Sequence, residues 1–98
     1  MKKKAMVDKI QIHKELCDEL HELYERKNAD YGDSFGKSYE EFGPVMSAIR
    51  LSDKLNRFKA LIKGRQRVND ESVRDTLIDL ANYAIMTIVE MDIQELGE

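Results

Sequence analysis

The 98-residue sequence has little cysteine, proline or glycine, and it has no tryptophan. The single cysteine, Cys17, cannot form a disulfide within the chain, which favours a reducing compartment such as the cytoplasm. One proline and five glycines are too few for a flexible linker between domains, so one domain over residues 1–98 is expected. Strand-like alternation is also missing, and the apolar periodicity predicts an all-α fold.

The chain also lacks a strong excess of charge and any long apolar run. Its net charge is -3 although 36% of its residues are charged, which gives no overall basic field for nucleic acid. No apolar run approaches the roughly 20 residues of a membrane span. The cationic start, within a segment 1–6 that we expect to be flexible, is not followed by the apolar stretch of a signal peptide. We therefore expect a cytoplasmic protein without a membrane partner.

Three long helices are expected, over residues 7–29, 44–63 and 69–96. Pro44 suits a first helical turn and Gly64 suits a C-terminal stop. The helix between them is apolar on most sides, which is typical of a central position. Three helices cannot cover it completely, so we expect a homodimer or higher homo-oligomer to complete a helical bundle.

The segment 28–43 interrupts this helical pattern and is expected to be a loop rich in glycine and aromatic residues. Its aromatic residues are Tyr31, Phe35, Tyr39 and Phe42. In one interpretation at least two of them attach the loop to the core. In the other, one or more form a wall against a planar ligand such as a nucleobase, with Tyr31 and Phe35 closing over the base.

The most informative polar pattern lies on the last expected helix. Glu71, Asp75, Asp79 and Asn82 fall within an arc of roughly 80° at the border of the apolar face. Such a stripe is either a solvated face or a set of ligands for a divalent metal. Asp79 stands in mid-helix among apolar neighbours, where an aspartate is a poor helix former.

A second charged group lies on the central helix. Arg50, Asp53 and Arg57 fall within roughly 60° of one another. They form either ordinary ion pairs along the helix or part of a polyphosphate site. In the polyphosphate site, acids hold Mg²⁺ and cations bind the phosphate oxygens that the metal leaves free.

Three segments resemble a known family. KNADYGDSF (27–35), RLSDKLNRFKALI (50–62) and DESVRDTLIDLANYAIM (70–86) are similar to a nucleotide-modification-associated domain of phage and bacterial proteins. The resemblance runs from about residue 27 to residue 91. That family in turn resembles the MazG-like all-α nucleoside triphosphate pyrophosphohydrolases. The resemblance therefore implies a MazG-like helical bundle in a bacterial or phage-infected cytoplasm.

The MazG-like enzymes use Mg²⁺ held by acids in the patterns ExxE and ExxD, and they form dimers. By position, Asp79 matches the last acid of ExxD and Asp53 matches one acid of ExxE. Thr76 and Arg50 stand where two further acids are expected. Asp75 and Glu71 are possible replacements, one and two turns back on the same face. Other acids that remain open as ligands are Glu40, Glu41, Glu15, Glu19 and Glu22.

The resemblance implies cleavage of a (d)NTP to (d)NMP and pyrophosphate. Mg²⁺, or alternatively Mn²⁺, is expected on four acids, namely Asp53, Glu71, Asp75 and Asp79. Asp53, Asp75 and Asp79 are also the candidate catalytic residues, one of them as the base for water. The expected substrate contacts are Arg50, Lys54 and Arg57 to the phosphates, Asn82 to base or sugar, and Tyr31 with Phe35 to the base. The alternative is an inactive nucleotide-binding, adaptor or anti-defence member of the same fold.

Overall fold

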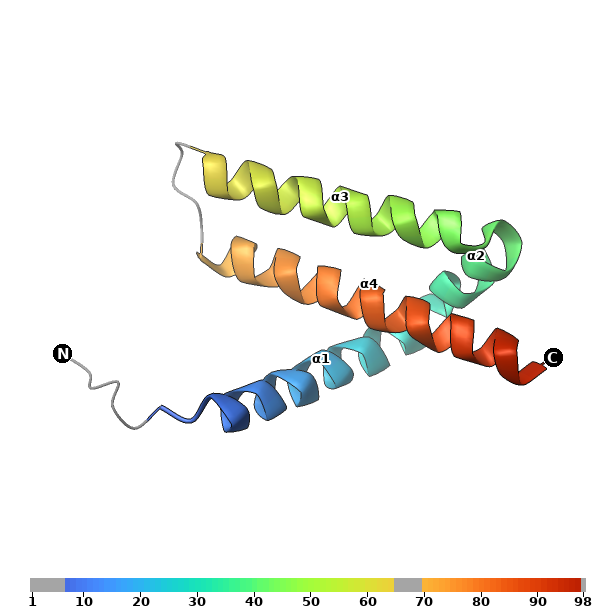
Figure 1. Cartoon of the computed structure of the whole chain (residues 1–98), viewed down its shortest axis with the longest axis horizontal. Helices are drawn as coiled ribbons and strands as arrows, with labels where there is room; N and C mark the ends of the chain where they lie inside the picture. Colours follow the sequence, from blue (N-terminus) through green and yellow to red (C-terminus); the bar gives the residue numbers. More distant parts are fainter. Residues whose placement is uncertain (1–6, 65–69, 98) are drawn as a thin grey trace. The chain divides into compact units, whose positions relative to one another are not determined.

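The computed structural model describes residues 7–64 and 70–97, and within these ranges the side chains of all residues but 70–72. The expected flexible segment 1–6 lies outside the described residues. The regular structure in the described ranges is all helical (Figure 1). Four helices are present there instead of the three that the sequence predicts, namely α1 (Lys9–Tyr31), α2 (Ser34–Phe42), α3 (Pro44–Lys63) and α4 (Asp70–Gly97). The chain divides into two compact units, Met1–Gly32 and Asp33–Glu98.

The first unit consists of α1. The Asp8 side chain caps this helix by accepting a hydrogen bond from the backbone N–H of Gln11 at 3.1 Å. The helix ends at Gly32, whose φ of 61° is left-handed and suits glycine. Lys14 and Asp18 form an exposed ion pair one turn apart at 3.0 Å. Such a pair stabilises a helix by only about 0.3–0.5 kcal/mol.

Segment 28–43 is mostly helical, so the expectation of a loop there is wrong. Its first residues continue α1 to Tyr31, and Ser34–Phe42 forms α2. A short turn at Gly43, with φ of 74°, joins α2 to α3. Phe35 and Tyr39 lie one turn apart on the buried face of α2. This confirms the interpretation in which at least two of the aromatic residues attach the segment to the core.

The core of the second unit lies where α2 packs against the start of α3 and the second half of α4. Phe35, Tyr39 and Met46 are buried together, and the partly buried Tyr83 and Met86 pack against them. The rings of Phe35 and Tyr83 are stacked, with centroids 5.8 Å apart and planes inclined by 15°. This aromatic cluster fixes α2 on the α3–α4 pair.

Helices α3 and α4 form an antiparallel hairpin, and their bounds confirm the helices expected over 44–63 and 69–96 (Figure 1). Pro44 occupies the first turn of α3 and Gly64 follows its last residue, as the sequence predicts. Two side-chain contacts set the register. The hydroxyl oxygens of Ser47 and Thr87 are 2.8 Å apart, and further along the hairpin Lys54 contacts Asp79.

Several large apolar side chains of α3 remain exposed. They are Val45, Ile49, Leu55 and Ile62. Within the second unit, neither α2 nor α4 covers these side chains. The long apolar segments are nevertheless interrupted by charge, and no helix in the described ranges is long and apolar enough to cross a membrane.

Candidate functional site

The predicted charged residues of α3 and α4 meet at one contact. Lys54 Nζ lies 3.0 Å from Asp79 Oδ2, and each side chain is 27% exposed. The two residues come from different helices, so this is a cross-helix ion pair and not the pairing along one helix that sequence spacing suggests. A half-buried pair is better shielded from solvent than a surface pair, so its geometry is better defined.

The other predicted residues of α3 lie around Lys54 and are exposed. Arg50 precedes Lys54 by one turn and Arg57 follows it by almost one turn, so all three cations fall within an arc of roughly 60°. Asp53 is exposed and adjoins Lys54 in the sequence. The name charged face is used below for Arg50, Lys54 and Arg57 together with Asp53, Asp75 and Asp79.

On α4 the residues of the predicted polar stripe differ in how far they are buried. Asp75 is exposed, whereas Asp79 and Asn82 are half-buried. Asp79 and Asn82 also take part in further interactions besides the Lys54 contact. The side chain of Glu71 lies outside the described residues. Thr76, which stands at an expected acid position, is 3% exposed, so the break in the pattern falls on a buried position.

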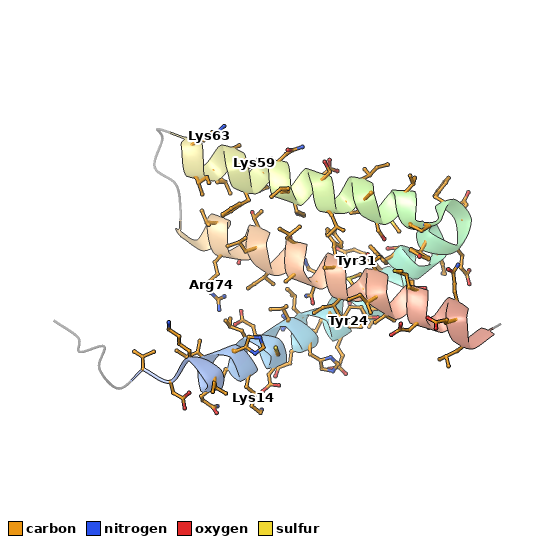
Figure 2. The ribbon with its side chains drawn as sticks, in the orientation of Figure 1. Lys14, Tyr24, Tyr31, Lys59, Lys63 and Arg74 are labelled. Carbon is orange, nitrogen blue, oxygen red and sulfur yellow. The ribbon has the colours of Figure 1, made fainter. Side chains whose placement is uncertain are left out.

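The other lysines and arginines that the structure describes on α3 and α4 lie away from the charged face. Figure 2 shows Lys59 and Lys63 on α3 and Arg74 on α4. By helical spacing, each of them points roughly 140–180° away from the Lys54–Asp79 contact. Lys59 and Lys63 are exposed. Lys59 therefore provides a matched control for substitutions of Lys54.

The two aromatic residues expected at a base differ in their surroundings. Phe35 is 7% exposed and its ring is stacked on Tyr83 within the core. This packing supports a structural role for Phe35 over a wall against a ligand. Tyr31 is exposed at the C-terminal end of α1 in the first unit, and its contact with a base stays a prediction (Figure 2).

The expected magnesium site depends on the acids of the charged face, one of which is paired with a cation. Mg²⁺ requires near-octahedral oxygen ligands and is usually held by one or two carboxylates, waters and substrate phosphates. Here Asp79 carries the one half-buried carboxylate, and this carboxylate forms an ion pair with the ammonium group of Lys54. Among the side chains that the structure describes, no group of three or more His, Cys, Asp and Glu could hold an ion.

A second acidic group lies near the aromatic cluster. The pKa of Glu90 is raised, chiefly because its carboxyl group is partly buried, and further by the negative charges of Asp33 and Glu40. Glu40 was one of the acids left open as a metal ligand. Its negative charge opposes the ionisation of Glu90, and its role as a metal ligand stays a prediction.

Sequence reasoning missed the hydroxyl contact between α3 and α4. Thr87 Oγ1 lies 2.8 Å from both Ser47 Oγ and the carbonyl oxygen of Tyr83. A hydroxyl carries one proton, so Thr87 satisfies both contacts when it donates to the carbonyl and accepts from Ser47. The small polar Ser47 within an apolar helix was the signal available, but nothing local to it identifies Thr87.

The fold and the site define a small all-α protein whose helical hairpin carries a mixed cationic and acidic face. The chain belongs to the family described as nucleotide modification associated domain 1, whose model matches residues 27–91. This match covers well over half of the 98 residues, including all of α2 and α3. No curated protein and no solved structure matches the chain.

Proposed function

We propose that this protein binds the polyphosphate of a nucleoside or deoxynucleoside triphosphate on its charged face. The observation that carries the proposal is the Lys54–Asp79 contact, which holds an ammonium group at a defined position between two exposed arginines. A triphosphate carries several negative charges, and lysine and arginine are the side chains that neutralise and hydrogen-bond them. The family to which the chain belongs is named for nucleotide modification, which supports a nucleotide ligand.

The same proposal assigns neighbouring side chains to the nucleoside. Asn82 is half-buried one turn beyond Asp79, where its amide would donate to and accept from a base or sugar edge. Asp79 orients Lys54 through the ion pair. Arg50 and Arg57 bind terminal phosphate oxygens, because the guanidinium group matches two oxygens at once.

Hydrolysis of the bound (d)NTP to (d)NMP and pyrophosphate is a second candidate function, implied by the MazG-like resemblance. The observation in its favour is that Asp75 and Asp79 occupy successive turns of α4, and that Asp53 precedes Lys54 in the sequence of α3. One of these carboxylates would accept the proton of the attacking water. A catalytically inactive nucleotide-binding or adaptor member is favoured instead by the buried Thr76 and by the pairing of Asp79 with lysine.

Binding and turnover are measured separately. Calorimetry with each of the four dNTPs and with inorganic tripolyphosphate should show saturable binding to the intact protein. The double variant Arg50→Gln/Arg57→Gln should weaken tripolyphosphate binding at least tenfold, since two phosphate contacts are lost. Lys59→Gln, which removes one cation of the same helix outside the charged face, is the control. No binding of any of these ligands would disprove the proposal.

Turnover is followed by phosphorus NMR of the same mixtures with and without Mg²⁺. If the wild type produces pyrophosphate and (d)NMP and the Asp79→Asn variant does not, the hydrolase function is established. Binding without product, in protein whose circular dichroism shows intact helices, would identify the non-hydrolysing member.

We also propose that the protein is a homodimer. Among the residues that the structure describes in the second unit, the exposed large apolar side chains of α3 and α4 outnumber the buried ones, and such a surface is typical of an interface between protein chains.

A further inference from the structure

Asp79 is the acid that the sequence most strongly marks as a metal ligand, yet its carboxylate contacts an ammonium group. The 3.0 Å separation of Lys54 Nζ and Asp79 Oδ2 is that of a charge-assisted hydrogen bond. A divalent ion coordinated by the same oxygen would lie about 2.0–2.1 Å from it. The ammonium group and a metal at Oδ2 would therefore compete for that oxygen, and two positive charges on one small carboxylate would also repel each other.

We propose that Lys54 takes the place of a divalent cation at Asp79, so that the charged face binds phosphate without a resident metal. In this arrangement Asp79 is a positioning residue for Lys54. The inference rests on the proposed function, because it specifies how the same face binds the polyphosphate.

The charges of the face support this assignment. Its three carboxylates, Asp53, Asp75 and Asp79, are matched by three cations, Arg50, Lys54 and Arg57. A site that attracts Mg²⁺ concentrates negative charge, whereas this face carries no net negative charge from its described side chains. The cations of the face thus offset its described acids, and no excess of negative charge remains there to attract a divalent cation.

The register of the hairpin also supports phosphate binding without a resident metal. The Ser47–Thr87 and Lys54–Asp79 contacts place Arg57 level with Thr76, one turn along the antiparallel pair. Thr76 is neutral and buried, so the helix position across from Arg57 supplies no carboxylate for a metal. Lysine and arginine thus follow one another along the edge of α3, beside a single half-buried acid.

A test with the metal alone uses electron paramagnetic resonance of added Mn²⁺. Wild-type protein and Lys59→Met should bind Mn²⁺ weakly and equally. Lys54→Met should bind it at least tenfold more tightly, because Asp79 loses its ammonium partner, and adding Asp79→Asn should remove that gain. Equal affinity in Lys54→Met and the wild type would overturn the inference.

The second test measures tripolyphosphate binding by calorimetry, in EDTA and in excess Mg²⁺. The wild type should bind in EDTA within about threefold of its affinity in Mg²⁺. Lys54→Met should weaken binding at least tenfold and Lys54→Arg should largely restore it. Asp79→Asn should also weaken binding although it removes a negative charge, because Lys54 is no longer held in place; tighter binding would contradict the positioning role.

The two proposals fail in different ways. Binding that requires Mg²⁺ and is indifferent to Lys54 would overturn the metal-free assignment and leave nucleotide binding intact. Absence of binding in both buffers, for tripolyphosphate and for all four dNTPs, would overturn the proposed function itself. Thermal unfolding of each variant, with Lys59→Met as the reference, shows whether the fold is retained.

Discussion

At the scale of single residues, Phe35 is one of the buried aromatic side chains that form the core. It is 7% exposed and stacks on Tyr83, whereas Phe42 at the end of the same helix is 61% exposed. Removal of a buried phenyl ring typically destabilises a protein by about 3–5 kcal/mol. We expect Phe35→Ala to lower the free energy of unfolding by at least the lower value and Phe42→Ala to change it little, as measured by urea denaturation. Equal effects of the two substitutions would contradict this description of the core.

A second residue, Glu90, makes the stability of the hairpin depend on pH. Its folded pKa is raised by burial and by Asp33 and Glu40, so the ionised carboxylate is unfavourable in the folded state. This unfavourable contribution is fully present above the folded pKa and disappears as the pH falls below the pKa of the unfolded chain. Glu90→Gln should therefore raise the melting temperature at neutral pH.

The increase in melting temperature caused by Glu90→Gln should become smaller as the pH falls from above the folded pKa of Glu90 to below its pKa in the unfolded chain. Its size at neutral pH should also be smaller in a Glu40→Gln background, where one of the opposing charges is already absent. A stabilisation that stays constant from neutral to acid pH would show that packing, and not ionisation, is responsible.

At the scale of helices, the sequence predicts the hairpin well because its signals are local. Pro44 and Gly64 mark the two ends of α3, and α4 begins at Asp70, within one residue of the start expected from the sequence. Helix α2 was missed because glycines on both sides of it resemble a loop. The signal that identifies it is the spacing of Phe35, Tyr39 and Phe42 by four and three residues, which is helical.

The candidate site was less predictable than the helices that carry it. Spacing along α3 groups Arg50, Asp53 and Arg57, and spacing along α4 groups Asp75 with Asp79. The partner of each side chain on the other helix depends on the register of the hairpin. That register follows from packing of residues far apart in the sequence, so the Lys54–Asp79 pair could not be derived from the periodicity of either helix.

The register itself can be tested at the hydroxyl contact. Ser47 is 2% exposed and lies 2.8 Å from the hydroxyl of Thr87. A neutral hydrogen bond of this kind stabilises a protein by about 0.5–1.5 kcal/mol. A double-mutant cycle of Ser47→Ala and Thr87→Val should give a coupling energy in that range by chemical denaturation. Additive effects of the two substitutions would show that the helices do not adopt this register.

At the scale of the whole molecule, the surface of α4 carries a second apolar pattern besides its packing on α3. Side chains spaced alternately by four and three residues form an apolar stripe, defined as Leu77, Ala81, Ala84, Ile88 and Met91. Leu77, Ala84, Ile88 and Met91 are exposed. The spacing averages 3.5 residues, which is the repeat by which helices pack along a common seam. A stripe of this kind is typical of a surface on which another helix packs, and the proposed homodimer would supply that helix from a second chain.

We therefore expect the purified protein to sediment as a dimer at micromolar concentration. Ile88→Glu places a charge at an apolar position that is 56% exposed in one chain, so it should leave the fold of that chain intact and weaken association at least tenfold. Leu96→Glu is the matched control, because Leu96 is 86% exposed on the same helix but outside the apolar stripe. A wild-type monomer across this concentration range would contradict the homodimer. Equal weakening by both substitutions would show that charge alone, and not the stripe, controls association.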